Sequence, residues 1–258
     1  MRLYIEIFGK KIPSYGLLII IGIVLANIIA YKLIHKKKHD INEFIIIEAY
    51  TFLGAFIGAK LLYLFVSYQE IEWHKILDCH YLNQLMRGGF VFYGGLFGGL
   101  LFALLAGKIH KLQVTDYIRS YIFLIPFIHT FGRIGCFMAG CCYGIPYKGF
   151  GAVVYPKESL APSGVFLFPV QLIEAILLLS ISITIYLLQA KYEWNYTIEL
   201  YLIAYAIIRF ILEYLRYDDV RGTIGNMSTS QLLSLIIIVI MAFHISRKYN
   251  RKASHYEA

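Results

Sequence analysis

The chain has 258 residues, of which 59% are hydrophobic and only 16% are charged. These proportions exclude an ordinary water-soluble domain and predict a protein with several membrane spans. The formal net charge of +8 does not indicate a nucleic-acid partner, because the basic residues form short clusters between apolar segments, where they face anionic lipid.

Seven apolar runs follow one another, each close to the roughly 20 residues that a helix needs to cross a bilayer. In lipid the backbone must satisfy its own hydrogen bonds, so each run is predicted to be a helix. The runs are Tyr15–Ile34, Phe44–Val66, Gly88–Gly107, Tyr117–Phe137, Phe168–Gln189, Thr197–Leu215 and Ser228–Ile245. Because no Pro/Ser-rich linker or repeat divides the chain, we expect residues 1–258 to form one all-α bundle of about seven transmembrane helices.

The basic residues of the short loops predict the orientation in the membrane. They follow the first, third and fifth runs, and four more lie in the C-terminal tail. The residues are Lys32, Lys36, Lys37, Lys38, Lys108, Lys111, Lys191, Arg247, Lys248, Arg251 and Lys252. These parts are expected to be cytoplasmic, which places the N-terminus outside the cytoplasm and the C-terminus inside it.

Glycines recur four residues apart in the second and third runs, as Gly54 with Gly58 and Gly94 with Gly98. This spacing lets two helix backbones approach closely. It is compatible with a cleft lined by backbone, but close helix packing is the preferred interpretation, because such pairs are common in membrane bundles.

Several charged residues lie within the apolar runs, where each costs roughly 2.5–3.5 kcal/mol and needs a partner or a polar cavity. Arg209 and Glu213 are four residues apart and can pair on one helix face. Arg133 has no acidic residue within four positions, and its planar guanidinium suits phosphate oxygens. Two arginines at the same membrane side suggest a phospholipid headgroup as ligand, with snorkelling or internal pairing as the alternative.

Gln171 and Glu174 are three residues apart, just after Pro169, which suits the first turn of a helix. Their side chains can share one face of that helix. They are predicted to position a headgroup or a phosphate-binding arginine, or to form ordinary interhelical hydrogen bonds.

Three of the four cysteines follow Arg133 with the spacing C-x4-C-C, at Cys136, Cys141 and Cys142. This spacing matches no usual zinc or iron–sulfur motif, so no metal site is predicted. Arg133 stands one helical turn before Cys136 and could favour a nucleophilic thiolate. A disulfide between Cys79 and Cys141 or Cys142 is a second interpretation. In a third, the cysteines are small buried side chains that take part in no reaction.

Six segments together resemble the prolipoprotein diacylglyceryl transferase family of bacterial inner-membrane enzymes. In chain order they are S-Y-G-L (Ser14–Leu17), G-A-K-L (Gly58–Leu61), R-G-G-F-V-F-Y-G-G-L (Arg87–Leu96), G-R-I-G-C-F-M-A-G-C-C-Y-G (Gly132–Gly144), F-P-V-Q-L-I-E-A (Phe168–Ala175) and R-F-I-L-E-Y-L-R (Arg209–Arg216). The resemblance implies transfer of the diacylglyceryl group of phosphatidylglycerol to the lipobox cysteine of a preprolipoprotein, without a cofactor. It also implies a location in the bacterial cytoplasmic membrane, among membrane lipids.

The resemblance also implies roles for individual residues. Arg133 and Arg209 match the family's essential arginines and would stabilise the leaving phosphate. The predicted catalytic residues are Arg133, Arg209, Tyr93, Cys136 and Cys141, and the predicted substrate-binding residues are Tyr15, Gln171, Glu174, Glu213 and Gly135.

The chain departs from the family pattern at four of these motif positions. Cys136, Ala139 and Cys141 stand where the family's G-R-x-G-N-F-I-N-G-E signature has two asparagines and a glutamate, and Tyr93 replaces a histidine. Tyrosine, with a pKa of about 10, is a poorer base than histidine. The phosphate-binding groups therefore remain while the acid–base groups differ. A phospholipid-dependent transferase with another acceptor and a membrane thiol–disulfide protein are the alternative functions.

Overall fold

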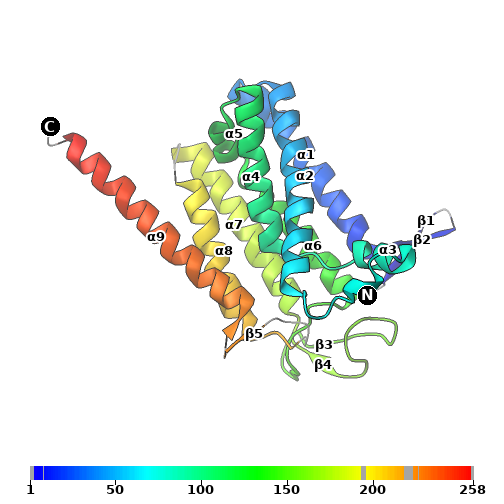
Figure 1. Cartoon of the computed structure of the whole chain (residues 1–258). Coiled ribbons are helices and arrows are strands. Elements are labelled where there is room, and N and C mark those ends of the chain that lie inside the picture. The colour runs from blue at the N-terminus through cyan, green and yellow to red at the C-terminus, as the bar shows by residue number, and fades with distance from the viewer. Residues whose placement is uncertain (1–2, 8, 193–195, 218–222, 226, 257–258) are drawn as a thin grey trace. The chain divides into compact units, whose positions relative to one another are not determined.

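The computed structural model describes residues 3–7, 9–192, 196–217, 223–225 and 227–256. Helices make up most of the described chain (Figure 1). They are α1 (Ser14–Lys37), α2 (Ile41–Val66), η1 (Trp73–Lys75), α3 (Cys79–Arg87), α4 (Phe92–His110), α5 (Val114–Tyr121), α6 (Leu124–Ala139), α7 (Val170–Tyr192), α8 (Thr197–Glu213) and α9 (Thr229–Tyr256). The all-α membrane class predicted from the sequence is confirmed.

Three short antiparallel strand pairs accompany the helices. They are β1 (Tyr4–Ile7) with β2 (Lys10–Pro13), β3 (Val153–Val154) with β4 (Phe166–Leu167), and β5 (Thr223–Ile224) with β6 (Met227–Ser228). In the first pair Tyr4 lies opposite Pro13, which brings the chain to the start of α1. These pairs organise the connections outside the apolar runs.

The chain divides into two compact units whose boundaries fall within α1 and α5. The first unit comprises Met1–Ala30 and Arg119–Ala258, and the second comprises Tyr31–Ile118. The first unit therefore contains most of the predicted site residues, and Tyr93 belongs to the second.

Five described helices are long and apolar enough to cross a membrane, and the pair α5–α6 raises the number to six if it counts as one span. The predicted count of about seven is therefore too high. The difference arises at the run Thr197–Leu215, which forms α8 with only 17 residues. At 1.5 Å per residue a helix of this length is about 25 Å long, less than the hydrocarbon thickness of about 30 Å.

The predicted continuous span Tyr117–Phe137 is broken into α5 and α6, which are bent by 51° at the break. Pro126 explains the break, because it lacks the N–H group that would bond to the carbonyl of Ile122, and its ring crowds that carbonyl. Pro126 instead occupies the first turn of α6, where a missing donor costs nothing. The helix that carries Arg133 thus starts at Leu124.

In the second unit α2 and α4 pack along their glycines. A Cβ atom on Gly58 would lie 2.9 Å from the Cα of Gly98 and would meet the carbonyl of Gly94, while one on Gly54 would meet the carbonyl of Gly98. Only glycine permits this approach of the two backbones. The packing interpretation of the glycine repeats is confirmed.

Lys60 on α2 is buried in the same unit. Its ammonium donates to the carbonyls of Leu85, Gly88 and Gly89, at 2.6 Å for Gly88 and 3.5 Å for Gly89. It also lies 5.0 Å from the centre of the Phe90 ring. The lysine therefore satisfies the carbonyls at the end of α3 and holds the segment that leads into α4.

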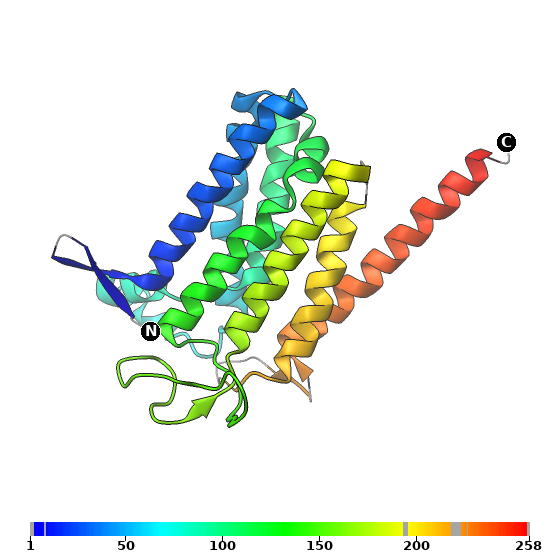
Figure 2. The same ribbon diagram turned by 180° about the vertical axis from the view of Figure 1, so that it is seen from behind.

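In the first unit successive helices pack against one another, α6 on α7, α7 on α8 and α8 on α9. Figure 2 shows α7, α8 and the start of α9 as neighbours with alternating direction. Two hydroxyls link α7 to the other helices: Ser182 donates to the carbonyl of Phe123 at 2.8 Å, and Thr130 donates to that of Ala175 at 3.4 Å. Such hydrogen bonds fix helix pairs where no water competes.

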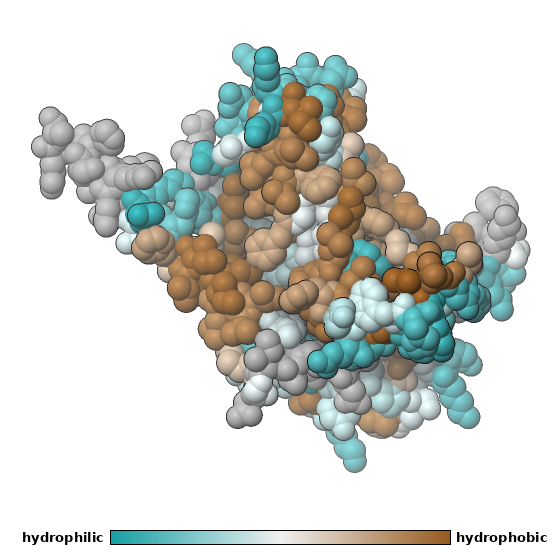
Figure 3. Space-filling model, viewed as in Figure 1, coloured by the Kyte–Doolittle hydropathy of each residue, from teal (hydrophilic) through white to brown (hydrophobic). Residues whose placement is uncertain are grey.

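Large hydrophobic side chains are exposed along the helices, and examples are Ile20, Phe65, Ile176 and Val239. Figure 3 shows hydrophobic residues over the middle of the helices and hydrophilic residues towards their ends. In water this surface would be unfavourable, whereas in a bilayer it faces lipid tails. The chain is a multi-pass membrane protein.

Candidate active site

Four charged side chains of the first unit are buried among α6, α7 and α8. Arg133, Glu174, Arg209 and Glu213 expose 8%, 1%, 6% and 4% of their surface, respectively. A charged side chain buried among membrane helices needs an oppositely charged or hydrogen-bonding partner. The helices that carry them pack in sequence order, which brings the side chains together.

Glu174 lies between the two arginines. Its Oε1 is 3.0 Å from Nη2 of Arg133, and its Oε2 is 3.9 Å from Nη1 of Arg209. Arg209 also forms the predicted pair with Glu213, with 2.8 Å between Nη2 and Oε2. The structure thus brings both arginines to one carboxylate of α7, which fits both the positioning role predicted for Glu174 and the alternative of internal pairing of the arginines.

One further residue completes this arginine–carboxylate cluster, which we define as Arg133, Glu174, Arg209, Glu213 and Arg216. Nη1 of Arg216 is 4.0 Å from Oε2 of Glu213. Arg209 donates to the hydroxyl of Ser230 on α9 at 3.2 Å. Three arginines and two glutamates give the cluster one positive charge in excess.

The two central arginines keep donors that no protein group uses. Nε of Arg133 and Nη1 of Arg209 are buried and have no hydrogen-bond partner in the described part of the chain. An unsatisfied buried donor costs about 1–3 kcal/mol. A ligand with oxygen acceptors would remove this cost, and phosphate oxygens match guanidinium groups best.

Arg216 and Ser230 were not singled out from the sequence. The spacing E-Y-L-R places Arg216 three residues after Glu213, which is a sequence signal for an ion pair. Ser230 had no such signal, because only the packing of α9 on α8 brings it to Arg209.

The cysteines of the first unit gather at the C-terminal end of α6. Gly140 caps the helix with φ = 74°, and its N–H bonds to the carbonyls of Cys136 and Phe137. Cys142 follows with φ = 58°, a left-handed conformation that is uncommon for a residue other than glycine. These two turns fold the chain back, so that the sulfur atoms of Cys136, Cys141 and Cys142 lie within 4.8 Å of one another.

Backbone hydrogen bonds tie the cysteine segment to the end of α8. The N–H of Ile145 bonds to the carbonyl of Leu215 at 3.0 Å, and that of Tyr217 bonds to the carbonyl of Tyr143 at 3.1 Å. Gln171 of α7 donates to the carbonyl of Cys141 at 2.8 Å. The predicted substrate-binding residue Gln171 thus holds the cysteine segment in place.

The thiols influence one another's ionisation. Hydrogen bonds from Cys136 and Cys141 lower the pKa of the Cys142 thiol, and the charges of Arg216 and Arg133 act in the same direction. All four cysteines are free thiols in the structure. Cys79 belongs to the second unit and the other three to the first, so the alternative pairing of Cys79 with Cys141 or Cys142 stays a prediction.

Gly135 on α6 lies directly against the start of α1. A Cβ atom there would be 3.1 Å from the Cα and 3.3 Å from the carbonyl oxygen of Tyr15. Tyr15 itself keeps 43% of its surface exposed. The two predicted substrate-binding residues therefore meet, and the glycine is needed for the close approach of the helices.

Tyr93 is buried on the first turn of α4 in the second unit, next to the ring of Phe92. Its predicted role concerns groups of the first unit, and that role stays a prediction.

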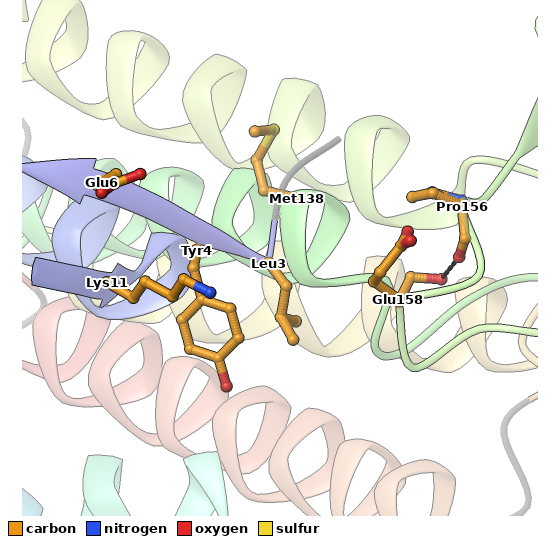
Figure 4. A pocket seen from close by; sticks show the side chains of 8 residues that line it. Leu3, Tyr4, Glu6, Lys11, Met138, Pro156 and Glu158 are labelled. Atoms are coloured by element: carbon orange, nitrogen blue, oxygen red, sulfur yellow. Dashed lines mark hydrogen bonds between the residues drawn. The ribbon is translucent and has the colours of Figure 1, made fainter. Parts of the chain in front are cut away.

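A separate pocket of 340 Å³ lies beside the N-terminal strands (Figure 4). Its walls come from β1, β2, the end of α6 and the loop after β3, where Ser159 donates to the carbonyl of Pro156 at 2.7 Å. The lining residues are Leu3, Tyr4, Glu6, Lys11, Met138, Pro156, Glu158 and Ser159. None of the predicted site residues lines this pocket, so it is not the candidate active site.

Comparisons with known proteins point to one family. The family model "Prolipoprotein diacylglyceryl transferase" matches residues 2–247. The phosphatidylglycerol–prolipoprotein diacylglyceryl transferase 2 of Clostridium perfringens is 33% identical, with 96% of this chain and 96% of the relative covered. The phosphatidylglycerol–prolipoprotein diacylglyceryl transferase of Clostridium tetani is 35% identical, with 94% and 96% covered. The protein of that name from Campylobacter jejuni is 29% identical, with 91% and 88% covered.

Proposed function

The chain belongs to the prolipoprotein diacylglyceryl transferase family, and on this premise we propose that it transfers the diacylglyceryl group of phosphatidylglycerol to a prolipoprotein cysteine at the arginine–carboxylate cluster. Family membership makes it a membrane-bound transferase. The observation that carries the assignment of the site is the pair of buried guanidinium groups of Arg133 and Arg209, which share the carboxylate of Glu174 while Nε of Arg133 and Nη1 of Arg209 have no hydrogen-bond partner among the described residues.

The two arginines would act on the phosphodiester of the lipid. In the reaction the acceptor sulfur bonds to the glycerol carbon that carries the phosphate, and the carbon–oxygen bond breaks. Its electron pair leaves with glycerol phosphate, which gains negative charge. Guanidinium donors that are already oriented stabilise such developing charge, and one donor of this kind is typically worth about 10²–10³ in rate. Glu174 keeps both arginines oriented while the excess positive charge remains available to the substrate.

The other predicted residues receive supporting roles. Glu213 holds Arg209, and Gln171 holds the carbonyl of Cys141. Tyr15 and Gly135 form the contact of α1 and α6 beside Arg133 and are proposed to border the bound headgroup. Tyr93 is proposed to assist the reaction of the acceptor, because the hydroxyl of a tyrosine can donate a hydrogen bond even though it is a poor base.

The thiol cluster favours a second candidate within the same fold, in which the acceptor is different. Cys136, Cys141 or Cys142 would then attack the lipid and hold the diacylglyceryl group before passing it on. Intact-protein mass spectrometry after incubation with phosphatidylglycerol would detect this adduct.

The proposed function is tested by the products of the purified chain with phosphatidylglycerol and a lipobox peptide. We expect a thioether-linked diacylglyceryl peptide and one glycerol phosphate for each peptide modified. The matched control is the same peptide with serine in place of its cysteine, which should stay unmodified. Folded protein that releases no glycerol phosphate and modifies no peptide would refute the transferase proposal.

We also propose that the N-terminus is extracytoplasmic and the C-terminus cytoplasmic. The basic residues Lys36, Lys37 and Lys38 after α1 support this orientation. Within the first unit α1 and α9 start at the same end of the helices (Figure 2). The N-terminal end of α1 and the C-terminal end of α9 therefore lie at opposite ends. The side chains of Arg251 and Lys252 are outside the described residues. Reporter fusions at the two termini would test the orientation, and equal accessibility of both would contradict it.

A further inference from the structure

The three clustered thiols have a geometry that the transfer reaction described above does not use. Their sulfur atoms lie within 4.8 Å of one another at the end of α6, with Cys136 buried and Cys141 and Cys142 half-buried. The spacing C-x4-C-C had argued against a metal. In the folded chain, however, the left-handed turns at Gly140 and Cys142 bring the three sulfur atoms within 4.8 Å of one another.

Three sulfurs in this arrangement suit a zinc ion. Zinc–sulfur bonds are about 2.3 Å long, so two sulfurs on one tetrahedral zinc lie about 3.8 Å apart. Shifts of about 1 Å, within reach of side-chain rotation, bring the thiols to that spacing. Three protein ligands also leave the fourth position free, which is the pattern of catalytic rather than structural zinc sites.

The surroundings hold the three ligands in place. The cap at Gly140 fixes the turn, Gln171 holds the carbonyl of Cys141, and the pairing of Tyr143 and Ile145 with the chain after α8 fixes the segment beyond. Outer contacts of this kind orient metal ligands.

The local charge balance also suits the ion. A zinc ion with three thiolates carries one negative charge, and the adjacent arginine–carboxylate cluster has one positive charge in excess. Arg133 and Cys136 are three residues apart on α6 and share one face of that helix. The metal would therefore stand next to the proposed phosphate site.

We propose that Cys136, Cys141 and Cys142 bind a zinc ion whose open position takes up the thiol of the acceptor cysteine. This inference rests on the proposed function. The zinc ion would deprotonate the acceptor thiol. A free cysteine with a pKa of about 8.5 is mostly protonated near neutral pH, whereas a thiol bound to zinc is deprotonated.

The step balances without an oxidant or reductant. The acceptor thiol releases its proton to solvent when its sulfur binds zinc. A sulfur lone pair then forms the bond to the glycerol carbon, and the carbon–oxygen bond breaks with its electron pair on glycerol phosphate. The thioether product carries no charge and is a weaker ligand, so it leaves the ion.

Metal content of the purified full chain tests the ligands. After loading with Zn²⁺ and removal of free ion, elemental analysis should find about one zinc per chain. Cys136→Ser, Cys141→Ser and Cys142→Ser should each weaken zinc binding by at least about tenfold. The matched control is Cys79→Ser, on α3 in the second unit, which should keep the zinc. Equal zinc content in all variants, or none in the native chain, would overturn the site.

Cobalt in place of zinc tests the open position in the native chain, so the result does not depend on how a variant folds. A lipobox peptide should change the visible absorption of the Co²⁺-loaded protein, and the peptide with serine should not. No change with the cysteine peptide would overturn the acceptor role.

The outcome also separates this inference from the proposed function. If metal-free protein forms the thioether product as fast as zinc-loaded protein, the zinc inference fails and the transferase proposal stands. If zinc and the acceptor peptide bind but no product forms, the transferase proposal fails and the metal site stands.

Discussion

Lys60 in the second unit and Arg133 in the first are both basic side chains buried on apolar helices, but their surroundings differ. The ammonium of Lys60 contacts three backbone carbonyls and has three protons to donate. Arg133 pairs with Glu174 and keeps an unused Nε, and Arg209 keeps an unused Nη1. Burial alone therefore does not identify a functional charge. A buried donor without a protein partner differs from one that is bonded, because a ligand with oxygen acceptors can satisfy it.

The two units also differ in what holds their helices together. In the second unit α2 and α4 meet through glycines, with backbone against backbone. In the first unit α6, α7 and α8 are linked through the charges of Arg133, Glu174 and Arg209. Four substitutions test this contrast.

Glu174→Gln should have the largest effect. It removes the carboxylate between two buried guanidinium groups, and breaking a buried pair costs about 3–5 kcal/mol. Thermal unfolding in detergent measures the loss. The double variant Arg133→Gln/Glu174→Gln is the matched control, because it removes both charges and should recover part of the stability. Strictly additive losses would show that the pair is not coupled.

Arg133→Gln should reduce transfer by about 10²–10³ through the loss of its charged donors. Glycerol phosphate release from phosphatidylglycerol measures the rate, and thermal unfolding shows whether the variant is folded. Arg119→Gln is the control, since this half-buried arginine of α5 is not part of the cluster. Similar rates for Arg133→Gln and the native chain would remove the arginine from the mechanism.

Gly58→Ala should destabilise the second unit by about 3 kcal/mol, at the upper end for overpacking, because the added methyl group meets backbone that cannot rotate away. Gly88→Ala is the matched control in the same unit, since nothing lies within 4 Å of a Cβ at that position. Unfolding curves of the two variants that coincide would contradict the close packing of α2 and α4.

Lys60→Met should have the smallest effect, about 1–3 kcal/mol of stability, because it leaves carbonyls near the end of α3 without their donor. The transfer rate per folded molecule should stay at the native level. A fall in rate like that expected for Arg133→Gln would show that Lys60 also serves the reaction, and the distinction between the two kinds of buried charge would fail.

Several features could be predicted from local sequence. The i,i+4 pair of Arg209 and Glu213 and the close packing at Gly54, Gly58, Gly94 and Gly98 both depend on spacing within a helix, and both were found. The span count was less accurate. Hydropathy alone cannot distinguish a full span from α8, a helix that begins with the apolar run at Thr197 but ends before it, at Glu213. It also cannot reveal that Pro126 breaks the fourth run.

The membrane class, the family resemblance and the choice of Arg133 and Arg209 follow from the sequence, because hydropathy, motif order and a charge within an apolar run are properties of short segments. The folded chain shows in addition that Glu174 bridges the two arginines, that Ser230 reaches Arg209, and that the sulfur atoms of three cysteines gather although their spacing matches no metal motif. These contacts depend on the packing of α7, α8 and α9 and on the left-handed turns at Gly140 and Cys142. Such long-range distances and backbone reversals leave no periodic signal in the chain.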